Sequence, residues 1–208
     1  DYPTARLERK SVQLKKDSLK GISQNDTIIE GKLTLATALL LKAKLEKMGA
    51  IVMLTRDKEN QCAFGKTFEH WWKEDFNRCL DSAYAQGHIT LNEKNHYKKS
   101  KDKKKVFREF FLQDDLRERG RKINSFDADL TIIIHFNVDE KNEGWTTTTN
   151  KNFCMTFVPG AIFPGALQKK EARFNLLRLM ITNHFNKSVG AAGLLSQKMS
   201  EILKVPLA

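Results

Sequence analysis

The chain has 208 residues, of which 40% are hydrophobic and 29% charged, and its formal net charge is +11. This length suits one domain, or one domain with an insertion, and the composition is globular rather than disordered. No apolar run approaches the roughly 18 residues that span a bilayer, so we expect no transmembrane segment. Its three cysteines include no CxxC pair, which argues against a disulfide framework and a thiolate zinc knuckle.

The positive charge is concentrated in one stretch. Residues 93–109 contain eight lysine or arginine residues and three acidic ones, which leaves a net charge of +5. Such a stretch is typical of a solvated helix end or loop, and it suits a polyanionic surface, including the bacterial envelope. Only Tyr97 and Phe107 are aromatic there, a thin basis for base stacking, so we expect no specific nucleic-acid binding.

Residues 1–29 are polar and rich in turn residues, which predicts a loop. Arg6 lies in a charged part of it, and loops of this kind also line active sites. The opening residues Asp1-Tyr2-Pro3 lead straight into charged sequence, which is unlike a signal peptide. We therefore expect an upstream segment to precede this sequence.

Residues 30–48 predict an amphipathic helix, because apolar residues recur at three- and four-residue spacing and Gly49 can stop the helix. Glu30 lies at or just before its first turn, where a carboxylate complements the helix dipole. Residues 51–56 (Ile-Val-Met-Leu-Thr-Arg) then predict a buried strand. A helix, a glycine and a strand in this order are typical of a βαβ unit with a parallel sheet.

Residues 57–105 interrupt this pattern. Within them, 67–85 predict a helix with a large aromatic face that includes Trp71, Trp72 and Phe76. A helical insertion packed on the domain is the favoured interpretation, and a substrate or partner groove is the second. The histidines of this region, His70, His88 and His96, have no metal-ligand spacing and are expected at the surface or in packing.

Residues 130–137 (Leu-Thr-Ile-Ile-Ile-His-Phe-Asn) follow a predicted helix, 106–124, and have the continuous apolar character of a central strand. His135 and Asn137 stand at its C-terminal end, where ligands collect in open α/β sheets. The residue type alone allows His135 to be a metal ligand, a general base or a hydrogen-bonded core residue.

A further strand is predicted at 153–158, followed by helices at about 168–186 and 190–203. The fold class expected is therefore α/β, with a mostly parallel central sheet flanked by helices, in a single domain, 1–208, that contains the 57–105 insertion. Nothing near Ala208 resembles a final strand, so the C-terminus is also expected to be cut short.

Four motifs in this order resemble the zinc-dependent N-acetylmuramoyl-L-alanine amidases of the amidase-3 type, which are cell-wall hydrolases. The family pattern has a glutamate ahead of the first long helix, hydrophobic-Thr-Arg after the next strand, and Asp-Leu followed by hydrophobic-His-x-Asn at a central strand end. The corresponding residues here are Glu30, Thr55-Arg56, Asp129-Leu130 and His135-Phe136-Asn137. The resemblance covers roughly 1–56 and 106–203.

The resemblance implies that Glu30 and His135 are two of three zinc ligands. The family's third ligand, a histidine in an Asp-x-Gly-His segment, would precede Asp1, and its catalytic glutamate would lie beyond Ala208. Asn137 is a candidate either to orient His135 or to contact substrate, and Arg6 and the Trp145–Thr149 stretch are weaker candidate substrate contacts. A zinc ion with an open position activates water for amide hydrolysis, and a nearby carboxylate moves the proton.

The function implied is cleavage of the amide bond between N-acetylmuramic acid and L-alanine of peptidoglycan, by a bacterial protein exported to the periplasm or the cell exterior. The 57–105 insertion is a candidate site for a regulatory partner, because an inserted helix blocks the site in some amidases of this type. The alternative is a non-catalytic amidase-like domain that binds peptidoglycan or a partner protein. A third interpretation, an unrelated α/β domain with structural Glu30 and His135, predicts no metal.

Overall fold

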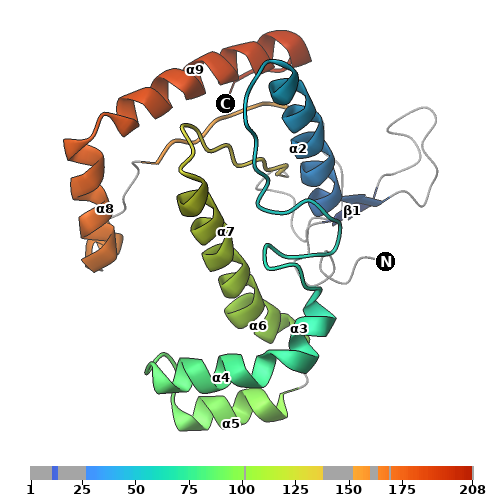
Figure 1. Cartoon of the computed structure of the whole chain (residues 1–208), viewed down its shortest axis with the longest axis vertical. Coiled ribbons are helices and arrows are strands. Elements are labelled where there is room, and N and C mark those ends of the chain that lie inside the picture. Colours follow the sequence, from blue (N-terminus) through green and yellow to red (C-terminus); the bar gives the residue numbers. More distant parts are fainter. Residues whose placement is uncertain are drawn as a thin grey trace. The chain divides into compact units, whose positions relative to one another are not determined.

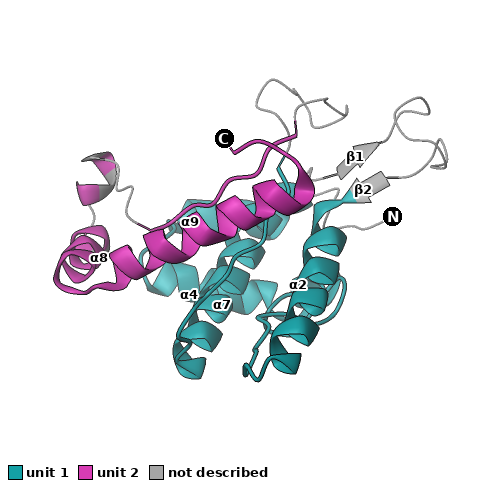
Figure 2. Ribbon diagram, turned by 90° about the horizontal axis from the view of Figure 1, so that it is seen from above, with its two compact units in different colours: residues 1–148 teal, residues 149–208 magenta. Residues whose placement is uncertain are grey.

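The computed structural model describes residues 11–13, 27–100, 102–137, 152–159, 164–168 and 170–207. The chain divides into two compact units, residues 1–148 and 149–208, shown in teal and magenta in Figure 2. In the part of the chain that is described, no helix is both long and apolar enough to cross a membrane.

In the described part of the first unit, two short strands precede helix α2 (Glu30–Lys47). Strand β1 (Ser11–Gln13) pairs antiparallel with β2 (Thr27–Ile29), with Ser11 opposite Ile29. Helix α2 (Glu30–Lys47) follows β2 without a loop (Figure 1). It ends where the sequence predicts, because Gly49 adopts a φ of +91° that disfavours any residue with a Cβ.

A parallel central sheet was the wrong expectation for this chain. Among the described residues, the sheet consists of the two strands β1 and β2. Residues 51–56 and 130–137 form no strands. Their apolar, β-branched sequence favours a strand, but a strand also needs a neighbouring strand to pair with. In 51–56, side chains take the place of a ladder: Lys42 Nζ donates to Val52 O (2.7 Å) and Lys122 Nζ to Thr55 O (3.3 Å). Ile51 and Ile133 are accordingly 86% and 77% exposed.

The described part of 57–105 contains α3 (Phe68–Glu74), α4 (Phe76–Ala85) and α5 (Leu91–Lys99), and α6 (Lys103–Val106) begins at its end. The predicted 67–85 helix is therefore divided at Asp75, which is the C-cap of α3. Thr67 caps α3 by accepting from the His70 N–H, and Thr90 with Glu93 forms a capping box on α5. Helices α4 and α5 lie side by side (Figure 1).

The next helical stretch is longer than the 106–124 predicted. It consists of α6 (Lys103–Val106), the π-helical turn η1 (Phe107–Phe111) and α7 (Leu112–Phe126) (Figure 1). One hydrophobic core joins it to α3, α4 and α5. The buried members of that core are Cys62, Phe68, Trp71, Phe76, Leu80, Tyr97, Val106, Phe107, Phe110 and Phe111.

Asp115 fixes the loop before α3 to this core. Its buried carboxylate accepts from the Ala63 N–H (2.5 Å) and from Arg119 Nε (2.8 Å). A buried charge without such partners would cost several kcal/mol. The Ala63 bond holds the loop against α7, and Arg119, on the same helix as Asp115, offsets the negative charge.

The second unit contains the 3₁₀ turn η3 (Pro164–Gln168) and the helices α8 (Lys170–Ile181) and α9 (His184–Leu203). The break between the helices falls at 182–183, earlier in the chain than the sequence predicts. The predicted strand 153–158 reduces to a single parallel bridge from Cys154 to Leu207. Thr156 holds this segment on α9, because its hydroxyl donates to Ala192 O (3.2 Å).

Candidate active site

Glu30 is held at the first position of α2, directly after β2. Only 8% of the residue is exposed. The N-terminal end of a helix stabilises a negative charge there, which offsets part of the cost of burying a carboxylate.

His135 reaches Glu30 from a segment 105 residues further along the chain. Its Nδ1 lies 3.1 Å from Glu30 Oε1, and the Phe136 backbone N–H also donates to Oε1, at 3.4 Å. The His135 side chain is 56% exposed, in contrast to Glu30. The structure thus brings together the two residues that the sequence selects as metal ligands, one inside the protein and one facing solvent.

Arg56 supports the helix end that carries Glu30. Its guanidinium donates to Gly31 O (2.5 Å) and lies 3.4 Å from Thr34 Oγ1. Sequence reasoning recognised Thr55-Arg56 as a motif but gave Arg56 no role. The structure assigns it one, since it connects the 51–56 segment to the first turn of α2.

A groove of about 1290 Å³ contains the Glu30–His135 pair. Its walls are α2, residues 50–56, α7 and residues 127–135, all in the first unit. The surface is largely apolar, with Glu30, Arg56 and Arg119 among its charged members. A concave apolar surface with a few converging polar groups is the usual form of a ligand site.

The remaining predicted site residues are not brought to the pair by any observed contact. Asn137 is exposed, two residues after His135. Arg6, and the Trp145–Thr149 stretch, lie outside the described residues. Among the residues that are described, no group of three or more His, Cys, Asp or Glu side chains is placed to hold a metal ion.

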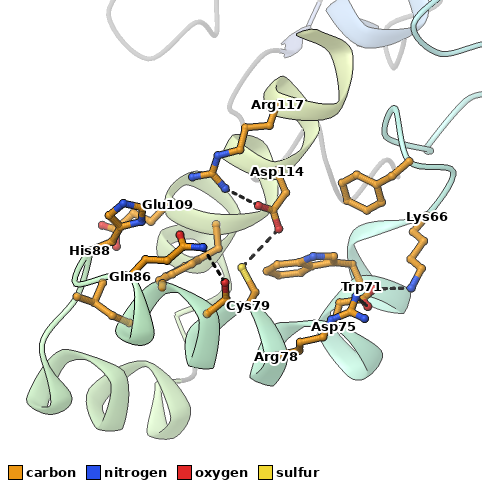
Figure 3. A pocket seen from close by; sticks show the side chains of 15 residues that line it. Lys66, Trp71, Asp75, Arg78, Cys79, Gln86, His88, Glu109, Asp114 and Arg117 are labelled. Atoms are coloured by element: carbon orange, nitrogen blue, oxygen red, sulfur yellow. Dashed lines mark hydrogen bonds and ion pairs between the residues drawn. The ribbon is translucent and has the colours of Figure 1, made fainter. Parts of the chain in front are cut away.

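A second pocket, of about 760 Å³, lies in the helical region formed by α3, α4, η1 and α7 (Figure 3). Its charged groups pair with one another: Lys66 and Arg78 both contact Asp75, and Arg117 Nη1 is 2.8 Å from Asp114. Sequence reasoning did not find this pocket, because its residues come from 64–117 with no common motif.

The three histidines of 57–105 were expected at the surface or in packing. His88 lines the second pocket, and His70 and His96 are exposed. His70 Nε2 pairs with Glu74 at 2.6 Å.

Cys79 in this pocket is expected to be chemically inert. Burial, followed by the neighbouring Asp114 carboxylate 3.4 Å from the sulfur, raises the pKa of its thiol to about 12. At pH 8 only about 1 thiol in 10⁴ is then ionised, and the thiolate is the nucleophile. We expect iodoacetamide to modify Cys79 far more slowly than a free cysteine, as measured by peptide mass spectrometry.

Asp114→Asn should accelerate this alkylation, because losing the negative charge lowers the thiol pKa while burial keeps it above the ordinary value. Glu118→Gln, the same chemical change on the same helix, is the control and should leave the rate unchanged. Rapid alkylation of wild-type Cys79 at pH 8 would contradict the prediction.

A groove that contains a buried carboxylate and a half-exposed imidazole in contact has the form of a ligand-binding or catalytic site. Comparison with protein families agrees: the Amidase_3 model, described as N-acetylmuramoyl-L-alanine amidase, matches residues 15–206. The chain belongs to this family of peptidoglycan amidases, and the resemblance seen in the sequence is confirmed. No curated protein and no solved structure gave a match.

Proposed function

We propose that the chain is a zinc-dependent amidase that cleaves the bond between N-acetylmuramic acid and L-alanine, with Glu30 and His135 as two of the zinc ligands. The observation that carries the proposal is the 3.1 Å approach of His135 Nδ1 to Glu30 Oε1. The fold brings these two residues into contact although 105 residues separate them in sequence. Membership of the amidase family supports the class of reaction.

The donor chemistry of the pair fits zinc. A carboxylate oxygen and an imidazole nitrogen are both common zinc ligands, and mixed ligation suits this borderline-soft ion. Glu30 Oε1 and His135 Nδ1 share a hydrogen bond. Once the shared proton is lost, a lone pair on each atom is directed at the space between them, where a metal ion would bind. A third ligand is needed for a stable site, and the described residues do not supply it.

Zinc in such a site would lower the pKa of bound water towards about 7 and polarise the scissile carbonyl. The burial of Glu30 keeps its negative charge in surroundings of low dielectric, where it attracts a cation more strongly than at the surface. The exposure of His135 leaves one side of the pair open to a polymeric substrate. Arg56 keeps the first turn of α2, and therefore Glu30, in position.

Two further roles extend this proposal to residues without an observed contact. Asn137 and Arg6 would contact substrate. The protein would act outside the cytoplasmic membrane, where peptidoglycan is located.

Zinc content per chain tests the proposal. It is measured on the whole protein, with any residues that precede Asp1 or follow Ala208 retained, for the wild type and for Glu30→Gln and His135→Ala. We expect close to one zinc per chain in the wild type and a large loss in both variants. Glu46→Gln, at an exposed position of the same helix, is the matched control and should keep its zinc.

A second candidate function, an amidase-like domain that binds peptidoglycan or a partner without catalysis, is favoured by one observation. The described residues contain no three-ligand cluster. Zinc-free wild-type protein, with both variants folded, would reject the zinc amidase and leave this binding domain.

A further inference from the structure

The basic stretch between α5 and α7 has an electrostatic organisation that the amidase reaction does not explain. We define the basic patch as Lys99, Lys103, Lys104, Lys105 and Arg108, all exposed, at the end of α5, in α6 and in η1. Within the described part of the chain, none of the five forms an ion pair with a carboxylate (all N···O distances exceed 4.0 Å).

The acidic residues of the same stretch have other partners. Glu93 accepts from the Thr90 backbone N–H (2.7 Å) in the capping box of α5, and this bond lowers its pKa. Asp102 caps α6 by accepting from the backbone N–H groups of Lys104 and Lys105 (3.1 Å each). Glu109 accepts from the buried Tyr97 hydroxyl. The carboxylates hold the helices together, and the patch keeps its charge.

Asp81, another carboxylate of this helical region, also pairs with lysines outside the patch. It lies 2.9 Å from Lys94 Nζ and 3.7 Å from Lys98 Nζ, so it neutralises the lysines next to the patch. Within the patch, Lys104 and Lys105 lie four and three residues before Arg108, so like charges face one another on one helix. Such pairs destabilise a helix, and a bound polyanion relieves this repulsion.

Two of the lysines are positioned by aromatic rings. Lys105 Nζ lies 5.1 Å from the centre of the Tyr97 ring and Lys103 Nζ 6.0 Å from that of Trp72. Tyr97 is buried and Trp72 is stacked on Phe76, so neither ring is a free platform for a nucleobase. Lysine ammonium groups are point charges without the bidentate geometry of arginine, which suits a dispersed polyanion better than one precise ligand.

We propose that the basic patch is a second contact surface, separate from the catalytic groove, that binds the free carboxylates of peptidoglycan stem peptides and retains the protein on its polymeric substrate. This inference rests on the proposed function, since peptidoglycan is the polyanion that a member of this family meets. Retention by dispersed charge is weak at each contact and sensitive to salt, which lets the protein move along the polymer.

The test is pelleting of the whole protein with purified peptidoglycan sacculi, on ice and in EDTA, with soluble stem-peptide release measured in the same samples to establish that no turnover occurs. The patch variant replaces Lys99, Lys103, Lys104 and Lys105 by glutamine. The matched control replaces four exposed lysines elsewhere, Lys44, Lys47, Lys58 and Lys187, so that both variants have the same net charge. Thermal unfolding first establishes that both variants are folded.

We expect the patch variant to bind sacculi about tenfold or more weakly than the control variant, and wild-type binding to fall as salt rises. Sacculi whose carboxyl groups have been converted to neutral amides should bind wild type and patch variant alike.

Equal binding of unmodified sacculi by the patch variant and the control variant would overturn the proposal. So would a patch variant that keeps its affinity for sacculi but loses affinity for double-stranded DNA or anionic lipid vesicles, because the patch would then serve another polyanion. Neither result depends on zinc content, so the two proposals fail separately.

Discussion

Glu30→Gln should reduce the release of stem peptides from sacculi by on the order of 10³-fold or more. The substitution keeps the size and the position of the side chain but removes the charge that attracts a cation. Loss of metal-assisted stabilisation is worth several kcal/mol of activation free energy, and each 1.36 kcal/mol is a factor of ten in rate. His135→Ala should produce a loss of similar size, because it removes the other donor atom of the pair.

Two controls separate chemistry from folding in this experiment. Glu46→Gln repeats the chemical change at an exposed position of α2, and His184→Ala removes an exposed imidazole at the start of α9. Both should keep wild-type activity. An active Glu30→Gln protein would show that the pair is structural, and inactive controls would show that the loss comes from stability rather than from the site.

The two residues of the candidate pair could be selected from sequence because each is marked by the residues next to it. Glu30 lies at the start of a predicted helix, and His135 lies at the end of an apolar run. The contact between them is not local, and it was anticipated only through the family motifs. Arg56 shows the limit of this reasoning, since its hydrogen bond to Gly31 depends on how a segment 25 residues away folds back.

The helices were predictable for the same reason and the sheet was not. Helix α2 makes its backbone hydrogen bonds within one segment, so its formation depends on neighbouring residues, and Gly49 ends it. The apolar runs at 51–56 and 130–137 specify extended backbone, but pairing requires a partner that the run does not encode. In the described structure, lysine side chains from α2 and α7 bond to the carbonyl groups of 51–56, and Glu30 bonds to the backbone of Phe136.

The aromatic face of 57–105 packs inward. Trp71 and Phe76 are buried in the core with Phe107 and Phe110, and Trp72 stacks on Phe76 at a ring distance of 4.6 Å. A regulatory partner that binds this region would therefore contact other residues than Trp71 and Phe76. The aromatic residues stabilise the helical region.

Phe68→Ala should destabilise the first unit by about 3–5 kcal/mol, the usual cost of removing a buried phenylalanine ring. Phe68 is fully buried and is the centre of the aromatic cluster, with ring centres 5.3 Å from both Phe107 and Phe111 and 5.6 Å from Trp72. Each such pair adds about 0.5–1.5 kcal/mol to the burial of the ring. Urea unfolding followed by tryptophan fluorescence measures the effect, since Trp71 and Trp72 report on this core.

Leu91→Ala, at a half-exposed position of α5, is the control and should change the free energy of unfolding by about 0.5 kcal/mol or less. A Phe68→Ala protein as stable as this control would mean that the aromatic cluster does not hold α3 to η1.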